Sequence, residues 1–243
     1  MNTVFRNGDE VSRALAAGTP VVALETTVVT HGLPHPEGVK TAHALEDVIR
    51  RAGATPATIG ILRGAIRVGL THAELEQLAT TPNVAKVNLS NLAATLSAGC
   101  PGSTTVAATM FAAHASVFST GGIGGVHRDV EESGDVSADL SALARIPIAV
   151  VSAGAKAMLD LVANPIPAAD EMPSELYERA IQTALADADT RGVRGRALTP
   201  FLLERMRMLT GGESIRANQA LLRHNAKAAA DLAIALAEFT ATG

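Results

Sequence analysis

Strand-like and helix-like segments alternate through most of the 243-residue chain, and this alternation limits the folds that it can adopt. Short runs rich in β-branched side chains predict strands, and longer segments with apolar residues three or four apart predict helices. The predicted strands are residues 20–29, 57–62, 65–68, 85–87, 115–120 and 146–151, and the helices among them include 36–52, 103–113 and 138–145. This order predicts an α/β fold: a three-layer α/β/α sandwich around a largely parallel or mixed central sheet.

After Pro173 the pattern changes to helices alone, over residues 174–186, 200–209 and 214–239. The sequence contains no internal repeat, low-complexity linker or strong charge block that would mark a domain boundary. We therefore expect one domain over residues 1–243, with a helical C-terminal section.

Composition and charge exclude several classes of protein. The net charge of −4 and the pI near 6.0 argue against a nucleic-acid polymer as the main partner, and only 2% of the residues are aromatic, which argues against a base-stacking surface. The single cysteine, Cys100, cannot form a disulfide within the chain, and no apolar stretch reaches the roughly 20 residues of a membrane helix. We expect a cytoplasmic protein with no membrane partner, for which small anionic ligands remain open.

A lysine that closely follows a predicted buried strand is the first candidate for catalysis. Residues 146–151 predict the strand, Gly154 allows a sharp turn, and Lys156 would begin a helix over residues 157–161. Substrate crevices of open α/β sheets lie at the carboxyl ends of strands, where a desolvated lysine can attack a sugar carbonyl and form a Schiff base. A solvated lysine at a helix start is the alternative.

Glu25 interrupts the apolar run of residues 20–29. A carboxylate in such a strand is costly to bury unless it is paired, and desolvation would raise its pKa toward the range of a general acid. The alternative is an outward-facing residue on a half-exposed strand.

A glycine-rich loop follows the predicted strand 115–120. Residues 121–125 include four glycines, whose backbone N–H groups can bind an anion, and His127 and Arg128 add further donors. The spacing departs from the dinucleotide-binding fingerprint, so the loop favours a phosphate or phosphosugar. A plain glycine-rich turn is the alternative.

Further oxygen and nitrogen donors lie nearby in the sequence. Asp135 and Asp139 offer hard oxygen ligands for Mg²⁺ or Mn²⁺, although Ser137 between them could simply cap the helix 138–145. Lys86 could pair with a phosphate as a point charge, and Thr105 opens a predicted helix start that suits an anion. Solvated surface and an ordinary helix cap are the alternatives for these two.

Taken together, these residues resemble the pseudouridine-5′-phosphate glycosidase family, also described as indigoidine synthase A-like proteins. The resemblance spans nearly the whole chain in the family's order. The matching segments are residues 23–27, 31–34, 56–59, 68–70, 104–109, 120–128, 137–140, 153–156, 163–167, 199–203 and 209–212.

The resemblance implies an α/β/α enzyme, assembled as a homotrimer, that uses Mn²⁺ to cleave the C–C glycosidic bond of pseudouridine 5′-phosphate reversibly, giving uracil and ribose 5-phosphate. By position, Lys156 matches the nucleophile that forms an imine with the ring-opened sugar, Glu25 the proton donor and acceptor, and Asp135 the metal-associated carboxylate. The residues that match substrate contacts are Lys86, Thr105, Val106, Thr120, His127, Ser137, Ala138, Asp139 and Asn164.

The chain departs from the family pattern at two places. Residues 88–91 replace a polar turn that contains arginine. Between Leu161 and Val162 the chain lacks a segment of roughly sixty residues, by a comparison of lengths. Two alternatives follow: a catalytically inert homologue that binds a phosphosugar or assembles with other subunits, and an imine-forming, aldolase-like enzyme for another phosphosugar.

Overall fold

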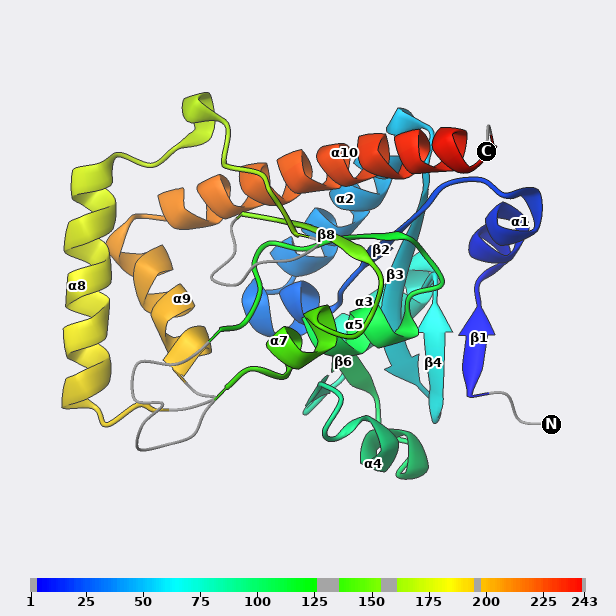
Figure 1. Cartoon of the computed structure of the whole chain (residues 1–243). Helices are drawn as coiled ribbons and strands as arrows, with labels where there is room; N and C mark the ends of the chain where they lie inside the picture. Colours follow the sequence, from blue (N-terminus) through cyan, green and yellow to red (C-terminus); the bar gives the residue numbers. More distant parts are fainter. Residues whose placement is uncertain (1–3, 126–135, 154–160, 195–197, 242–243) are drawn as a thin grey trace. The chain divides into compact units, whose positions relative to one another are not determined.

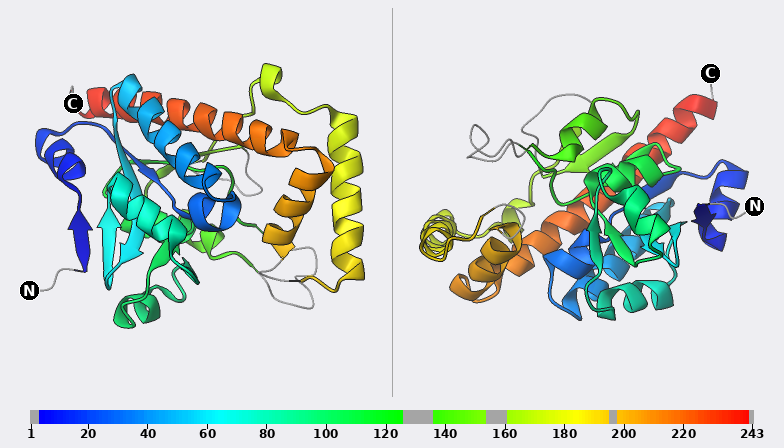
Figure 2. Two further views of the ribbon diagram at one scale, coloured as in Figure 1. Left: turned by 180° about the vertical axis from the view of Figure 1, so that it is seen from behind. Right: turned by 90° about the horizontal axis from the view of Figure 1, so that it is seen from below.

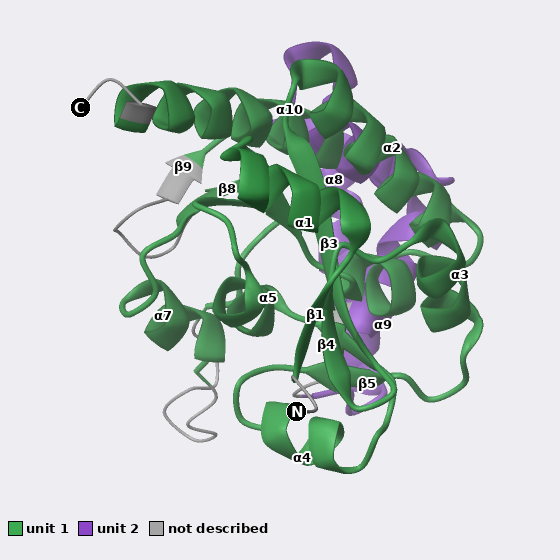
Figure 3. Cartoon of the chain, turned by 90° about the vertical axis from the view of Figure 1, so that its right-hand side faces the viewer, with its two compact units in different colours: residues 1–165, 222–243 green, residues 166–221 purple. Residues whose placement is uncertain are grey.

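The computed structural model of the protein describes residues 4–125, 136–153, 161–194 and 198–241. Contacts within the chain divide it into two compact units, residues 1–165 with 222–243 and residues 166–221 (Figure 3). The sheet and the candidate site lie in the first unit. The expectation of a single domain over residues 1–243 stays a prediction.

The described part of the first unit is built on a nine-stranded mixed sheet. Its main path has the order β1-β4-β3-β2-β7-β8-β9, while β6 pairs with both β3 and β5. Pairing is parallel except where β3 meets β4 and β6. The strands are β1 Phe5–Asn7, β2 Val21–Leu24, β3 Thr55–Leu62, β4 Ala65–Val68, β5 Ala85–Val87, β6 Gly102–Thr104, β7 Val117–Ser119, β8 Ala149–Ser152 and β9 Leu161–Ala163.

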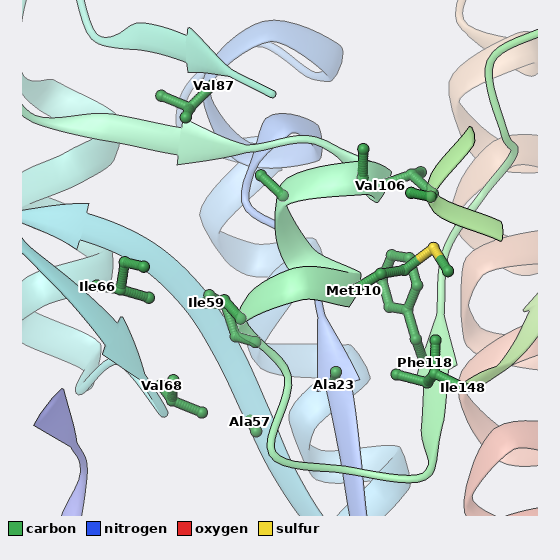
Figure 4. Packing of buried hydrophobic residues seen from close by; sticks show 14 of the residues in the cluster. Ala23, Ala57, Ile59, Ile66, Val68, Val87, Val106, Met110, Phe118 and Ile148 are labelled. Atoms are coloured by element: carbon green, nitrogen blue, oxygen red, sulfur yellow. The ribbon is translucent and has the colours of Figure 1, made fainter. Parts of the chain in front are cut away.

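Helices cover both faces of this sheet (Figures 1 and 2). Apolar side chains of α1 (Asp9–Ala17), α5 (Val106–Ala112) and α7 (Ala138–Leu143) pack on one face, and those of α2 (Glu37–Ala52) and the C-terminal part of α10 (Glu213–Ala241) pack on the other. Figure 4 shows Met110 of α5 and Phe118 of β7 pointing toward one another on the first face. The structure therefore confirms the predicted α/β/α class, because β2 has buried side chains on both of its faces.

The shorter elements connect these layers. The π-helical turn η1 (Val28–Gly32) follows β2, α3 (His72–Thr80) packs with α2, and α4 (Leu92–Ser97) lies between β5 and β6 in the sequence. The predicted hairpin is confirmed: β3 and β4 pair antiparallel across Arg63 and Gly64, which both have positive φ, 54° and 70°. This backbone matches the two-residue turns that hairpins favour.

Three sequence-based boundaries were wrong. The strand predicted over residues 20–29 ends at Leu24, because the next side chains bond to other strands and the backbone turns into η1. The helix predicted from residue 103 begins at Val106, since Gly102–Thr104 pair as strand β6. Residue 161, predicted to end a helix, begins β9.

The second unit is helical, as predicted for the C-terminal section. It contains the turn η2 (Ala168–Asp170), α8 (Ser174–Thr190), α9 (Leu198–Leu209) and the first part of α10. Its core is formed by Ala180, Ala184 and Met206. Among the described residues, no helix is both long enough and apolar enough to cross a membrane.

Candidate active site

The site forms where strand β3 changes its partner. Because β4 occupies one edge of β3, both β2 and β6 pair along the other edge, β2 as far as Thr58 and β6 from Gly60. Strand β2 ends at Leu24, opposite Thr58. Glu25 is the first residue beyond β2, so it lies at the fork between the two strands.

Threonine side chains close this fork around one carbonyl group. The hydroxyl groups of Thr26 and Thr104 both donate to the Ile59 carbonyl oxygen, at 2.8 and 2.7 Å. The Thr104 backbone N–H in turn donates to the Thr26 hydroxyl at 3.0 Å. All of these groups are buried, so the hydrogen bonds replace those of the interrupted sheet ladder.

The carboxylate of Glu25 is held by two hydroxyl groups. Thr120, directly after β7, donates to Oε1, and Thr27 donates to Oε2. The Thr27 hydroxyl also lies 2.7 Å from the Thr104 carbonyl oxygen. A hydroxyl group has one hydrogen, so it cannot serve both acceptors at once while Glu25 is ionised. When Glu25 is protonated, its own O–H can donate to Thr27, and every group is satisfied.

Electrostatics favour the protonated form as well. Burial raises the pKa of Glu25, and the negative charge of Asp139 adds to this increase. The hydroxyl groups of Thr120 and Thr27 and the positive charge of Lys86 act in the opposite direction without overcoming burial. The structure thus gives Glu25 the property that general acid–base chemistry requires.

Two nitrogen-containing side chains, Lys86 and His31, lie near this fork. Lys86, in the middle of β5, is exposed, and its charge acts on both Glu25 and His31. Burial lowers the pKa of His31, and Lys86 lowers it further, which favours a neutral imidazole. Its Nδ1 atom lies 2.6 Å from the Thr30 hydroxyl oxygen. The exposed ammonium group of Lys86 can attract an anionic substrate.

The start of α5 also faces this region. Thr105 occupies the cap position of the helix, but its side chain makes no capping bond, and its buried hydroxyl oxygen has no hydrogen-bond partner within the described residues. Val106 follows it as the first residue of the helix and is buried. A buried hydroxyl group without a partner is costly unless a ligand or water satisfies it, so Thr105 is suited to a polar ligand.

Asp139 holds the glycine-rich loop against α5. Its Oδ1 accepts from the Ala107 N–H at 2.9 Å, and its Oδ2 accepts from the Gly124 N–H at 2.8 Å. Ser137 caps α7 by accepting from the Asp139 N–H, and Ala138 begins that helix. A Cβ on residue 124 would lie 2.2 Å from the Ser137 hydroxyl oxygen, so only glycine fits there. The cap offered as the alternative for Ser137 is thus present, and the substrate roles of Ser137, Ala138 and Asp139 stay predictions.

Asn225 of α10 is a functional candidate that sequence reasoning missed. This fully buried side chain donates to the Thr120 carbonyl oxygen at 2.8 Å and accepts from the Asn164 side chain at 3.1 Å. It therefore links the residue after β7 to the residue after β9. The available signal was a polar residue among the buried apolar positions of α10, between Leu222 and Ala226.

The predicted residues at the carboxyl ends of the parallel strands come together. Strands β2, β7, β8 and β9 are adjacent and parallel, so Glu25, Thr120 and Asn164 follow strand ends on one edge of the sheet. In the sequence Lys156 follows the last residue of β8 by four positions, but it falls outside the described residues, as do His127 and Asp135. Open α/β sheets bind their substrates at this edge.

The predicted Mn²⁺ has no ligand set among the described residues of this site. Asp135 lies outside them, and both carboxylate oxygens of Asp139 already accept backbone N–H groups. Glu25 is bound by two hydroxyl groups. The described side chains therefore do not by themselves fit the metal, and the role of Asp135 stays a prediction.

Comparisons with known proteins identify the family of the chain. A family model described as "Indigoidine synthase A like protein" matches residues 10–163 and 161–235. The chain therefore belongs to the family of indigoidine synthase A-like proteins, as the sequence motifs predicted.

Two relatives and two solved structures illustrate the similarity. The pseudouridine-5′-phosphate glycosidase of Methylobacterium nodulans is 44% identical over 93% of this chain and 86% of its own. That of Roseobacter denitrificans is 42% identical over 97% and 96%. The crystal structure of the prealnumycin C-glycosynthase AlnA in complex with ribulose 5-phosphate has a TM-score of 0.87 and 30% identity over 100% of both chains. An indigoidine synthase A-like protein of Thermotoga maritima has a TM-score of 0.82 and 26% identity over 98% of both.

These alignments also bear on the length of the chain. The match to the Methylobacterium nodulans protein is 291 positions long, although this chain has 243 residues, so the relative contains residues that have no counterpart here. The two stretches matched by the family model meet at residues 161–163. This is the place at which we predict that a family segment is absent.

Proposed function

We propose that the protein cleaves the C–C glycosidic bond of pseudouridine 5′-phosphate reversibly, giving uracil and ribose 5-phosphate. The observation that carries this proposal is the environment of Glu25, a partly buried carboxyl group with a raised pKa at the edge of the sheet where open α/β folds bind substrates. Relatives at 44% and 42% identity named pseudouridine-5′-phosphate glycosidase support the choice of reaction.

The chemistry requires a nucleophile, because a C-glycoside has no leaving oxygen that an acid could protonate. In the proposed reaction the amine of Lys156 attacks the sugar carbon that carries the base, and the ring C–O bond breaks as Glu25 gives a proton to the departing oxygen. The attached nitrogen then gives a proton back to Glu25, and its lone pair forms the imine as the C–C bond breaks. The uracil carbon, which keeps the electrons of that bond, takes the proton from Glu25. Water hydrolyses the imine, which releases ribose 5-phosphate and restores the lysine.

Other described residues have roles that their positions support. Lys86 attracts the phosphosugar, and the unpartnered Thr105 hydroxyl offers it a hydrogen bond. Thr120 orients the Glu25 carboxyl group, and Asn225 fixes the backbone of Thr120. In this role the two are positioning residues, and the substrate contact that the family resemblance implies for Thr120 stays a prediction.

The experiment is uracil release from pseudouridine 5′-phosphate, followed by mass spectrometry with Mn²⁺ present. Wild type is expected to release uracil, Lys156→Ala to release none, and Glu25→Gln to lose about 10²–10⁴-fold in rate, the usual contribution of a general acid–base group. Release at the wild-type rate by Lys156→Ala would refute the imine.

One observation favours a second candidate, an inert homologue that binds the phosphosugar without turnover. The alignment to the Methylobacterium nodulans protein is 291 positions long, so that relative contains residues without a counterpart in this 243-residue chain, which supports the predicted absence of a family segment. Saturable binding of ribose 5-phosphate, without uracil release by a folded wild-type protein, would support this candidate over the first. The homotrimer, the Mn²⁺ cofactor and the cytoplasmic location rest on the sequence alone and stay predictions.

A further inference from the structure

Three side chains that the proposed reaction does not use converge on the side of α2. His43 and Glu46 lie one helical turn apart on α2, and His72 is the first residue of α3. The Glu46 Oε2 atom lies 3.8 Å from His43 Nδ1 and 3.6 Å from His72 Nε2. All three donor atoms lie within 4.8 Å of one another, and the two imidazole ring centroids are 3.9 Å apart.

Two of the three donor atoms of this cluster are buried without hydrogen-bond partners among the described residues. The Glu46 side chain is only 3% exposed, and its Oε1 accepts a hydrogen bond from the Thr58 hydroxyl at 2.6 Å. Neither Glu46 Oε2 nor His43 Nδ1 has a hydrogen-bond partner within the described residues. A buried carboxylate oxygen and a buried imidazole nitrogen that face each other in this way leave an unfilled requirement for a positive or hydrogen-bonding group.

Arg50 does not meet this requirement. Its Nη1 atom lies 3.5 Å from Glu46 Oε2, but its Nε and Nη2 atoms donate to the two carboxylate oxygens of Glu10, each at 2.9 Å. The guanidinium group is thus held by Glu10. The Arg50 guanidinium group therefore lowers the net negative charge near Glu46 without giving Glu46 Oε2 a hydrogen bond.

The geometry suits a small divalent metal ion. A tetrahedral zinc ion with bonds of about 2.0–2.2 Å separates its ligand atoms by about 3.3–3.5 Å. The two distances from Glu46 Oε2, 3.8 and 3.6 Å, are close to this separation, and the two histidine nitrogens lie within 4.8 Å of each other. Two histidines and one glutamate are a ligand set that Zn²⁺ uses, and the Thr58 hydroxyl orients the carboxylate as outer-shell groups do. His72 is 68% exposed, so a metal can enter from solvent and keep a water molecule.

We propose that His43, Glu46 and His72 form a Zn²⁺-binding site that joins α2 to α3. This site contains none of the residues assigned to the cleavage reaction, and its existence does not depend on that reaction. The bound metal links two helices and, through Glu46 and Thr58, strand β3. Its expected effect is on stability.

The test is calorimetric titration of the tag-free, chelator-treated protein with Zn²⁺ alone. Wild type is expected to bind one Zn²⁺ at this site, Thr58→Val to bind it about 10–100-fold more weakly, and His72→Ala to lose the site. His35→Ala is the matched control, because His35 forms an exposed pair with Glu76 at 2.9 Å and belongs to no group of three metal-binding side chains within the described residues. It is expected to bind as wild type does.

Two further measurements make the result decisive. Asp135→Asn should bind Zn²⁺ at the His43–Glu46–His72 site as wild type does. This result would distinguish that site from any metal bound near the predicted catalytic residues. Zn²⁺ at about 100 times its dissociation constant should raise the melting temperature of wild type by about 5–10 °C and leave that of His72→Ala unchanged. Equal Zn²⁺ affinity in wild type and a folded His72→Ala, or no binding by folded wild type, would overturn the proposal.

Discussion

Replacing Asp139 with asparagine tests whether one buried carboxylate fixes the glycine-rich loop to α5. The two oxygens accept from the backbone N–H groups of Ala107 and Gly124, at 2.9 and 2.8 Å. Asparagine has nearly the same shape, but one oxygen becomes an NH₂ group that faces a backbone donor. One of the two hydrogen bonds must therefore be lost.

The size of the effect follows from the charge of the acceptor. A hydrogen bond to a charged group contributes about 1.5–3 kcal/mol, and for a chain of this size each kcal/mol lowers the melting temperature by about 2–4 °C. We expect Asp139→Asn to lower the free energy of unfolding by about 2 kcal/mol and the melting temperature by about 4–8 °C. The substitution also loosens the loop that follows Thr120, so uracil release should fall even at temperatures at which the variant is folded.

Scanning calorimetry measures the first effect, and Asp231→Asn provides the control. Asp231 is exposed on α10 and pairs with Lys227 four residues earlier, a contact that contributes only about 0.3–0.5 kcal/mol. If Asp139→Asn shifted the melting temperature no more than Asp231→Asn does, the carboxylate would not hold the loop.

Three further predictions concern the same edge of the sheet. Because burial raises the pKa of Glu25, this carboxyl group keeps its proton to higher pH in the folded state than in the unfolded state. The contribution of Glu25 to stability is therefore present at low pH and is lost as pH rises through the folded pKa. Urea unfolding at several pH values should therefore show that the free energy of unfolding falls less steeply with pH in Glu25→Gln than in wild type. Thr120→Val removes a hydroxyl group that lowers this pKa, so it should move the fall to higher pH. Parallel profiles for wild type and both variants would contradict this. Asn225→Leu leaves the buried Thr120 carbonyl and the partly buried Asn164 side chain without this partner and should lower the free energy of unfolding by about 1–3 kcal/mol in chemical denaturation. An unchanged midpoint would show that the link is dispensable. Gly124→Ala places a Cβ 2.2 Å from a hydroxyl oxygen and should lower both the melting temperature and uracil release. Gly122→Ala meets no atom of the described residues within 4 Å and should leave the melting temperature unchanged, so equal melting temperatures of the two variants would refute the packing argument.

The sequence predicted the layers of the fold because the relevant signals are local. Apolar periodicity identified α2 and the three C-terminal helices, and the Arg63–Gly64 turn identified the hairpin. The errors occurred where long-range pairing decides the structure. Nothing local distinguishes residues 25–29 from a strand, since β2 ends only because β6, about eighty residues later, takes its place beside β3.

The same reason limited the prediction of the site. Glu25 could be identified as a carboxylate within a predicted strand and Thr120 as the last residue of another, but the threonine contacts of Glu25 depend on the fork between β2 and β6. Asp139 was interpreted as a ligand for metal or substrate, and the structure shows that it accepts two backbone N–H groups. Asn225 was missed because its partners lie 105 and 61 residues away in the sequence.

The most direct test of the proposed mechanism is to trap the imine. The protein is incubated with ribose 5-phosphate and borohydride, digested, and analysed by mass spectrometry. The mechanism predicts a single modified peptide that carries the mass of ribose 5-phosphate less one oxygen atom on Lys156, and no such adduct in Lys156→Ala. An adduct on another lysine, or none in a protein that releases uracil, would contradict the mechanism.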